Sequence, residues 1–274
     1  MIATTRLTGI WSAVLTPVGE NYEPDAARAV AYYRDLLRDG IDGINLLGTT
    51  GEAMSLGAEQ RLRLMEAVAA GVPHERTMCG TGAASLADTV RLTRAAGELG
   101  FAAALIMPPF FYRDANDDGI LRFFDALLSR IGTLRSTIVL YNFPRMSGVT
   151  FTSDLVDRLI EAFPGTISGM KDSSNDVALQ QKLLERHPEL RVFPSTEETL
   201  IEAKRYGAAG CISGSVCLWP QAAHAAYAQG DTSAATAVAQ ARAALTGAPL
   251  ISLVRARVAQ TRNDDVWLRA MPPN

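Results

Sequence analysis

The chain has 274 residues, of which 48% are hydrophobic, 20% charged and 7% aromatic, so it is long and apolar enough to bury a large core. This composition excludes a small disulfide-stabilised scaffold and a disordered chain. The formal net charge is -3, with 26 basic and 29 acidic residues. Such a balance argues against a nucleic-acid partner and against a polybasic protein that binds membranes.

Eight short apolar segments alternate with longer segments of helical periodicity. The apolar segments predict strands at residues 10–15, 41–47, 76–79, 102–107, 137–141, 166–171, 191–193 and 210–213. The periodic segments predict helices at residues 25–38, 58–70, 86–99, 118–130, 153–162, 177–186, 197–206 and 221–229. This alternation is typical of α/β proteins with parallel strands and crossover helices. Eight repeats predict a (β/α)8 TIM barrel over residues 1–230; the alternative, a doubly wound sheet, lacks its Gly-x-Gly-x-x-Gly loop here.

The alternation ends near residue 231. Residues 232–245 are rich in alanine and helical in pattern, and residues 250–260 predict one more helix. We interpret residues 231–274 as a C-terminal helical appendage of the barrel.

Three features bear on the cellular location. The N-terminus lacks an apolar stretch long enough for a signal peptide, and no run of 18 apolar residues occurs in the chain. Cys79, Cys211 and Cys217 form no Cys-x-x-Cys pair, so we expect buried and reduced thiols. We therefore expect a cytoplasmic protein that binds neither membranes nor nucleic acids.

Lysine is rare in this chain: of the 26 basic residues only Lys171, Lys182 and Lys204 are lysines. Active sites of (β/α)8 barrels form at the C-terminal ends of the strands, and only Lys171 ends a predicted strand. An apolar barrel mouth would lower the pKa of its amine from about 10.4 and favour a free amine that attacks a ketone. A lysine that merely pairs with an acid is the alternative. Lys182 and Lys204 fall in helical patterns, where we expect solvated surface side chains.

A second strand end carries the run Gly48-Thr49-Thr50-Gly51-Glu52. Its two hydroxyls and its exposed backbone amides suit a bound carboxylate, because small residues let a ligand approach closely. An ordinary turn between a strand and a helix is the alternative. Glu52 is either a base or a structural carboxylate.

Tyr141 ends the fifth predicted strand, where a phenol can pass protons to and from a substrate beside the lysine. A core aromatic residue is the alternative. An amine, a carboxylate-binding turn and a phenol at one barrel mouth together predict imine chemistry on a 2-keto acid. His74, His187 and His224 lie away from the strand ends and show no metal-ligand spacing, so we predict no metal site.

These residues stand in motifs that resemble the dihydrodipicolinate synthase/N-acetylneuraminate lyase family of pyruvate-dependent class I aldolases. The resemblance extends from Gly9 to about Pro220. It is carried by residues 9–17 (GIWSAVLTP), 43–52 (GINLLGTTGE), 141–144 (YNFP) and 169–172 (GMKD).

The resemblance implies a (β/α)8 barrel with C-terminal helices that assembles as a homo-oligomer, usually a tetramer. It implies that Lys171 forms a Schiff base with pyruvate, that Tyr141 relays protons, and that Thr49 and Thr50 hold the pyruvate carboxylate. The backbone of Ile212 would line the site. The substrates would be a keto acid and an aldehyde. No metal or organic cofactor is implied, because the covalent imine performs the chemistry. Gly48 in the turn and Ser213 beside Ile212 are further candidates from these two strand ends.

One departure from the family bears on the substrate. Five residues after the tyrosine, the synthases carry an arginine that binds the carboxylate of aspartate semialdehyde, and this chain has Met146 there. Arg145 lies one place early, and a neighbouring residue on an extended segment faces differently. The loss of a bidentate carboxylate partner disfavours that substrate.

Two further comparisons with the family are less direct. Glu197 and Glu198 fall about where the lyase branch places acids that bind sugar hydroxyls. Many members also extend the proton relay with a tyrosine from a neighbouring subunit, and that place holds Phe111 here, with Tyr112 next to it. Either Tyr112 substitutes through a shifted loop or the relay is shorter.

The leading hypothesis is a lyase: a class I aldolase that reversibly cleaves a 2-keto-3-deoxy sugar acid to pyruvate and an aldehyde. The alternatives within the enzymes are 4-hydroxy-tetrahydrodipicolinate synthase and a keto-deoxy sugar-acid dehydratase. A non-catalytic keto-acid-binding protein is the alternative from another class.

Overall fold

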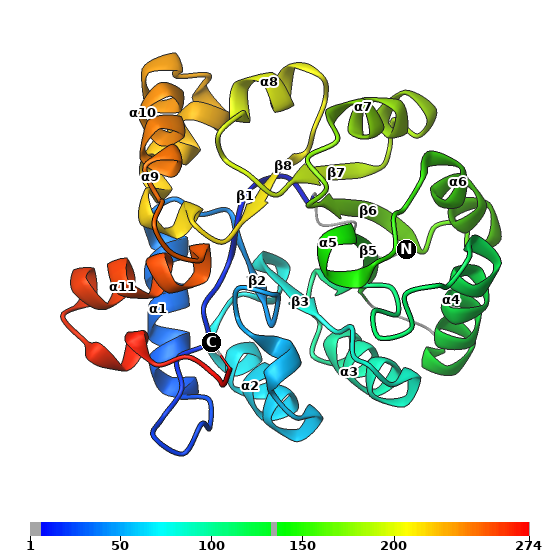
Figure 1. The fold of residues 1–274 in the computed structure, drawn as a ribbon, viewed down its shortest axis with the longest axis horizontal. Coiled ribbons are helices and arrows are strands. Elements are labelled where there is room, and N and C mark those ends of the chain that lie inside the picture. Colours follow the sequence, from blue (N-terminus) through cyan, green and yellow to red (C-terminus); the bar gives the residue numbers. More distant parts are fainter. Residues whose placement is uncertain (1–6, 133–135, 274) are drawn as a thin grey trace.

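The computed structural model describes residues 7–132 and 136–273, and shows eight parallel strands surrounded by helices (Figure 1). The strands are β1 (Gly9–Ala13), β2 (Gly43–Leu46), β3 (Thr77–Gly80), β4 (Ala103–Ile106), β5 (Thr137–Asn142), β6 (Ile167–Asp172), β7 (Arg191–Pro194) and β8 (Gly210–Ser213). Each strand lies within two residues of the predicted segment. The predicted (β/α)8 barrel is confirmed.

The strand order is β7-β6-β5-β4-β3-β2-β1-β8, so the sheet curls until β1 pairs with both β2 and β8. Trp11 of β1 is in register with Gly43 of β2 and with Ile212 of β8. At the remaining seam the backbone amide of Ala209, just before β8, donates to the carbonyl of Val192 in β7 at 2.8 Å. The barrel is therefore nearly closed.

The helices follow the strands as predicted, with one marked difference. They are α1 (Ala26–Arg38), α2 (Ala58–Gly71), α3 (Leu86–Glu98), α4 (Asp117–Ile131), the short α5 (Pro144–Ser147), α6 (Ser153–Ala162), α7 (Val177–Arg186) and α8 (Leu200–Arg205). The predicted helix at 197–206 begins only at Leu200. Glu197 lies in the preceding turn with its side chain buried, and this tertiary placement overrides the local helical pattern.

Successive side chains of each strand point alternately into the barrel and out toward the helices. Trp11, Met78, Leu105 and Val139 belong to the inner core. The outer core lies between the strands and the helices and contains residues such as Leu140. Because both faces are buried, the strands read as continuous apolar segments. The same alternation turns Tyr141 inward.

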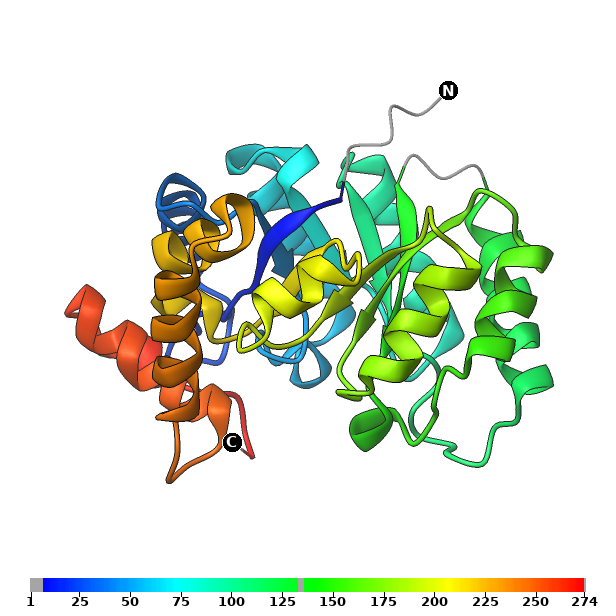
Figure 2. The same ribbon diagram turned by 90° about the horizontal axis from the view of Figure 1, so that it is seen from above.

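The C-terminal region packs on one side of the barrel, beside α1 (Figures 1 and 2). It contains α9 (Pro220–His224), a π-helical turn (Ala225–Gln229), α10 (Thr232–Ala243) and α11 (Leu250–Arg262). Trp267 lies fully buried beyond α11, and its ring is 4.7 Å from that of Tyr32 in α1. The predicted C-terminal helices are therefore present and share a core with the barrel.

Cys79, Cys211 and Cys217 are buried and free, as expected. Across residues 7–132 and 136–273, no helix is both long and apolar enough to cross a bilayer. The first six residues, which belong to the segment inspected for a signal peptide, lie outside the described residues.

Candidate active site

Lys171 and Tyr141 lie side by side at the C-terminal ends of β6 and β5. The two residues are in register between the parallel strands, so both side chains point into the barrel. The Lys171 Nζ lies 4.5 Å from the centre of the Tyr141 ring, and each residue is 4% exposed. The predicted amine and phenol therefore share one largely apolar space.

The turn after β2 reaches this pair through Thr49. The Thr49 Oγ1 and the Tyr141 hydroxyl are 3.1 Å apart and form a hydrogen bond in which either can donate. A bond between residues 92 positions apart brings the predicted carboxylate-binding turn and the phenol to one place. Lys171, Tyr141 and Thr49 thus converge, as their positions at strand ends predict.

The turn leaves some of its backbone donors to a ligand. The amides of Gly51, Glu52 and Ala53 donate to carbonyls within the turn. Within the part of the chain that the structure describes, no hydrogen bond uses the amides of Thr49 and Thr50, and both residues are only half-buried. Two adjacent amides and two hydroxyls suit the oxygen atoms of a carboxylate.

The backbone is strained just before this turn and at its last residue. Leu47 and Glu52 have positive φ angles of 54° and 53°, which residues other than glycine rarely adopt. Such strain costs of order 1–3 kcal/mol per residue and is concentrated at functional sites. Gly214, after β8, permits a further close approach, because a Cβ there would lie 2.6 Å from the Thr50 Oγ1.

A small cavity lies beside the bond between Thr49 and Tyr141. Its lining includes Gly48, Gly82 and Met107. The side chain of Arg61, which is 3% exposed, donates to the carbonyl oxygens of Gly80 and Gly82 at 2.9–3.0 Å and holds this wall in place. Sequence reasoning missed Arg61, since a buried arginine in α2 cannot be told from a surface one by periodicity.

The end of β8 contributes Ile212 and Ser213, both buried. Ile212 belongs to the inner core of the barrel, together with Tyr141. The Ser213 Oγ lies 3.3 Å from the Ser215 Oγ, which in turn donates to Glu197 at 2.6 Å. Burial raises the pKa of the Glu197 carboxyl, and hydrogen bonds from the two serines oppose that rise. Glu197 is thus 1% exposed and faces the end of β8, whereas Glu198 is exposed.

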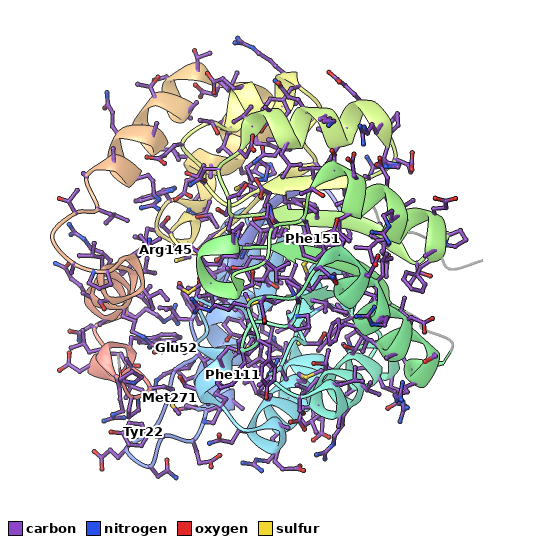
Figure 3. The ribbon with its side chains drawn as sticks, turned by 45° about the vertical axis from the view of Figure 1, so that its right-hand side comes forward. Tyr22, Glu52, Phe111, Arg145, Phe151 and Met271 are labelled. Atoms are coloured by element: carbon purple, nitrogen blue, oxygen red, sulfur yellow. The ribbon has the colours of Figure 1, made fainter. Side chains whose placement is uncertain are left out.

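The remaining candidates lie on exposed segments. Arg145 and Met146 are exposed on the short helix α5. The extended segment predicted for Arg145 is therefore wrong, because Pro144 begins a helical turn. Arg145 is labelled in Figure 3. Phe111 and Tyr112, in the loop after β4, are 74% and 75% exposed, and their rings pack edge to face at 5.2 Å. The single chain therefore brings together the lysine, Tyr141 and the turn after β2, but leaves Tyr112 and Arg145 at the surface.

Glu52 is a structural carboxylate. It is buried and forms an ion pair with Arg255 of α11, whose guanidinium also donates to the backbone carbonyl of Thr16 at 3.2 Å. This pairing decides between the two interpretations that the sequence leaves open for Glu52. The C-terminal helices consequently support the turn that carries Thr49 and Thr50.

Sequence reasoning also missed a polar pair on the outer face of the same strand ends. Asn142 and Asp172 directly follow Tyr141 and Lys171, and both are fully buried. The signal was present in the sequence: a carboxylate and an amide one residue beyond two inward-facing residues must point outward, into the layer between strands and helices.

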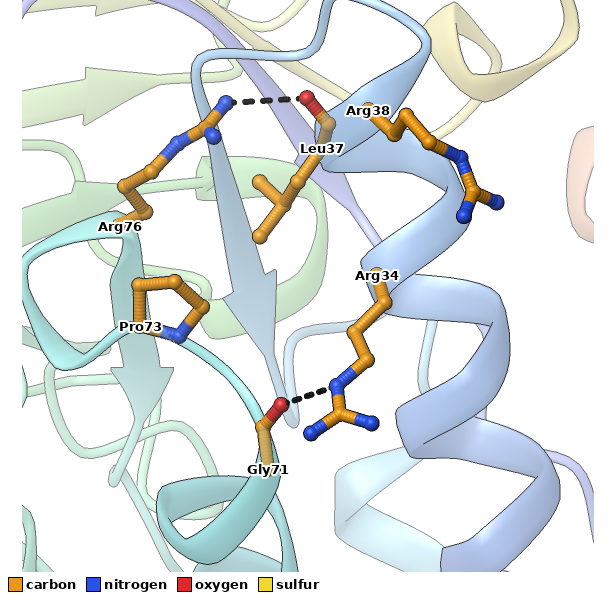
Figure 4. Close-up of a pocket in the computed structure, with 6 residues that line it drawn as sticks. All are labelled: Arg34, Leu37, Arg38, Gly71, Pro73 and Arg76. Carbon is orange, nitrogen blue, oxygen red and sulfur yellow. Dashed lines mark hydrogen bonds between the residues drawn. The ribbon is translucent and has the colours of Figure 1, made fainter.

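A second pocket lies at the opposite end of the barrel, where β2 and β3 begin (Figure 4). Arg34, Arg38 and Arg76 contribute to its lining. Arg34 donates to the carbonyl of Gly71, and Arg76 donates to that of Leu37 at 3.3 Å, so these guanidinium groups cap the ends of α2 and α1. We assign this pocket a structural role.

No group of three His, Cys, Asp or Glu side chains within residues 7–132 and 136–273 is placed to hold a metal ion. That the reaction needs no metal or organic cofactor stays a prediction.

The chain is similar in sequence to proteins of one known family. The sequence model of the Dihydrodipicolinate synthetase family matches residues 6–259. An uncharacterized DapA-like lyase of Chloroflexus aurantiacus is 35% identical over 85% of this chain and 78% of its own length. The N-acetylneuraminate lyase of Salmonella paratyphi B is 29% identical over 75% of this chain and 68% of its own length.

Among solved structures, the dihydrodipicolinate synthase of Agrobacterium tumefaciens superposes with a TM-score of 0.90. It is 30% identical in sequence, and the match covers 97% of this chain and 93% of that one.

Proposed function

Because this chain belongs to the dihydrodipicolinate synthetase family, we propose that it is a pyruvate-dependent class I aldolase. It reversibly cleaves a 2-keto-3-deoxy sugar acid to pyruvate and an aldehyde. The observation that carries this proposal is the convergence of the Lys171 amine, the Tyr141 phenol and Thr49 in one buried space.

In the proposed reaction the free amine of Lys171 adds to the C2 ketone, and loss of water leaves a protonated imine. The C4 hydroxyl then gives up its proton, and the C3–C4 bond breaks with its electron pair moving toward the iminium. The products of this step are an aldehyde and an enamine instead of a bare carbanion. Protonation at C3 and hydrolysis of the imine release pyruvate and restore the lysine.

Tyr141 carries the protons of these steps, helped by the carboxylate of the bound keto acid. Its hydroxyl lies within hydrogen-bond distance of Thr49, which suits a relay, because proton transfer requires heavy atoms about 2.6–3.2 Å apart. Thr49 and Thr50 bind the carboxylate with their hydroxyls and amides and thereby fix the keto acid against the lysine. Gly48 and Ile212 line the position of the keto acid.

The segment after β5, which contains α5, supports this substrate class. Met146 takes the place of an arginine that would bind a second carboxylate, and Arg145 points from an exposed position on α5. A polyhydroxylated keto acid without that second carboxylate suits this segment better than aspartate semialdehyde. The similarity to an N-acetylneuraminate lyase supports the same preference.

A second candidate is 4-hydroxy-tetrahydrodipicolinate synthase, which the solved structure from Agrobacterium tumefaciens favours. In that reaction the enamine of pyruvate would attack aspartate semialdehyde, with Arg145 as the carboxylate partner. Assays with aspartate semialdehyde and with a panel of 2-keto-3-deoxy sugar acids separate the two. We expect pyruvate release from at least one sugar acid, and efficient turnover of the semialdehyde would reverse our ranking.

We further propose that the protein works as a cytoplasmic homotetramer. The exposed aromatic rings of Phe111 and Tyr112 support an interface at the loop after β4, because soluble monomers rarely expose such neighbouring rings. Tyr112 is the candidate for the tyrosine that the family resemblance implies from a neighbouring copy.

The central experiment is reduction with borohydride in the presence of pyruvate, followed by peptide mass spectrometry. We expect one pyruvate adduct, on Lys171. The variant Lys171→Arg should form no adduct, whereas the matched control Lys182→Arg, at an exposed position of α7, should react as the wild type does. An unmodified Lys171 in the wild type would contradict the proposed mechanism.

A further inference from the structure

Asn142 and Asp172 form a hydrogen-bonded pair across the ends of β5 and β6. The Asn142 Nδ2 donates to the Asp172 Oδ1 at 2.7 Å, and both residues are fully buried. They are in register, as are Tyr141 and Lys171 one residue earlier. Because side chains alternate along a strand, the pair lies on the outer face of the two strand ends whose inner face carries the amine and the phenol.

The pair belongs to a wider hydrogen-bonded network. Asp172 also accepts from the backbone amide and the hydroxyl of Ser174, at 3.1 and 2.7 Å, and from the Gln180 Nε2 of α7 at 2.6 Å. Asn142 accepts with its Oδ1 from the Phe151 amide at 3.1 Å. The strand ends are thereby fastened to α7 and to the segment before α6.

The two oxygens of the buried Asp172 carboxyl group accept from four neutral donors. A buried polar group without hydrogen-bond partners is unfavourable, so these donors make the burial of Asp172 possible. Such satisfied networks rigidify their surroundings and specify one arrangement.

The strand pairing below the site is irregular. Ile138 pairs with Ile167 but the next residue, Val139, pairs with Gly169, so the register of β5 against β6 shifts by one residue. Such an irregularity changes where the following side chains point, and it often occurs next to active sites. The side-chain bond between Asn142 and Asp172 lies beyond this shift, at the position where register matters for Tyr141 and Lys171.

We propose that the Asn142–Asp172 pair is a positioning device that sets the Tyr141 hydroxyl against the substrate imine on Lys171. This inference rests on the proposed function. Adduct yield at saturating pyruvate reports an equilibrium amount of imine, whereas methyl-proton exchange reports a rate, and a displacement of about 1 Å costs roughly 100-fold in rate. Loss of the pair therefore slows the proton steps more than it reduces the amount of imine.

The test compares two readouts at saturating pyruvate. Adduct yield after borohydride reduction reports the imine, and exchange of the pyruvate methyl protons in heavy water reports proton transfer. We expect Asn142→Ser and Asp172→Ala to slow exchange about tenfold or more while the adduct on Lys171 still forms. Asn142→Ser is the gentler probe, because it leaves Asp172 its three other donors and decides the question if Asp172→Ala does not fold.

Two further variants separate positioning from simple destabilisation. Asp172→Asn retains an oxygen that accepts from Asn142 and Ser174. Its new amide faces Gln180, whose side-chain amide can turn so that its oxygen accepts from the new amide and its nitrogen donates to the Tyr206 hydroxyl. We therefore expect exchange within about threefold of the wild type. Ser136→Ala removes a buried hydrogen bond, from Ser136 to the Phe101 carbonyl, at the other end of β5. It should lower thermal stability but leave exchange within about twofold of the wild type.

The outcomes distinguish the two proposals. The positioning role is overturned if both Asn142→Ser and Asp172→Ala exchange the methyl protons at the wild-type rate. It is also overturned if Ser136→Ala slows this exchange as much as the pair variants do. A wild-type protein that forms no adduct with pyruvate overturns the proposed function and the positioning role with it. Slow exchange with a retained adduct, found only in the pair variants, supports both.

Discussion

At the scale of single residues, a substitution at Tyr141 can distinguish proton transfer from imine formation. The variant Tyr141→Phe keeps the ring beside the Lys171 amine but removes the hydroxyl that bonds to Thr49. We expect the pyruvate adduct to form and methyl-proton exchange to fall roughly 100-fold or more, the range of general acid–base contributions. Nuclear magnetic resonance in heavy water measures the exchange.

The matched control for that experiment is Phe143→Leu. The Phe143 ring lies 5.8 Å from that of Tyr141 but carries no hydroxyl. A comparable loss of exchange in Phe143→Leu would assign the effect to packing and contradict a proton-relay role for Tyr141.

A second prediction for single residues concerns Glu197 and the pH dependence of the free energy of unfolding. Burial raises the pKa of its carboxyl above the ordinary value of 4.5, so the folded protein holds the proton more tightly than the unfolded chain. The stability that this protonated carboxyl contributes is fully present below the pKa of the unfolded chain. It is lost as pH rises through the higher pKa of the folded protein. The variant Glu197→Gln cannot ionise, so its stability relative to the wild type should increase with pH.

Denaturant unfolding of Glu197→Gln and of the wild type, from acid to neutral pH, measures this difference. Glu198→Gln, the same substitution at the exposed neighbouring position, is the control for the change of residue itself. A constant difference for Glu197→Gln would mean that the carboxyl titrates normally.

At the scale of elements, the ion pair between Glu52 and Arg255 joins α11 to the turn after β2. Both side chains are buried. Removing one partner of a buried pair leaves an uncompensated charge and costs roughly 3–5 kcal/mol, whereas replacing both by apolar groups is often close to neutral. We therefore expect Arg255→Met to destabilise the protein strongly and the double variant Glu52→Leu/Arg255→Met to regain part of the loss. The remainder persists because the carbonyls of Thr16 and Trp267 lose a donor in both variants.

Chemical denaturation of the two single variants and the double variant gives the coupling energy of the pair. Arg91→Met, which breaks an exposed ion pair with Glu59, is the control and should change stability little. Additive losses in the double variant would show that the two residues are not coupled. A higher pyruvate KM in the stable double variant would further indicate that the pair supports Thr49 and Thr50.

The ends of the helices show where local sequence patterns predict secondary structure correctly and where they do not. The helices at residues 153–162 and 177–186 agree with the prediction at both ends, and Thr152 caps the first of them by accepting from the Leu155 amide at 3.1 Å. The helix at 197–206 is wrong at its start, because the burial of Glu197 is a tertiary event. Hydrophobic periodicity and helix capping depend on residues that are close in sequence. They therefore predict the ends of a helix correctly where no contact with a distant residue overrides them.

At the scale of the whole molecule, the exposed loop after β4 predicts self-association. Phe111 and Tyr112 expose about three quarters of their surface in the single chain. We expect sedimentation at micromolar concentration to show an oligomer, and the double variant Phe111→Ser/Tyr112→Ser to shift it toward smaller species. Association removes such apolar surface from water, which is the driving force.

Tyr22→Ser is the control for this prediction, since Tyr22 is also exposed but lies in the loop before α1. An oligomer that persists unchanged in the double variant would place the interface elsewhere. A monomeric wild type would contradict the proposed tetramer.

The barrel and its three principal site candidates can be predicted from the sequence alone. Alternation of apolar strands with periodic helices depends on neighbouring residues only, and the rule that chemistry lies at strand ends then selects Lys171, Tyr141 and Thr49. The distant groups that hold these residues in place cannot be predicted in this way. Glu52 meets Arg255 across 203 positions and Asn142 meets Asp172 across 30, because each choice depends on how the barrel closes and on which buried polar group needs a partner.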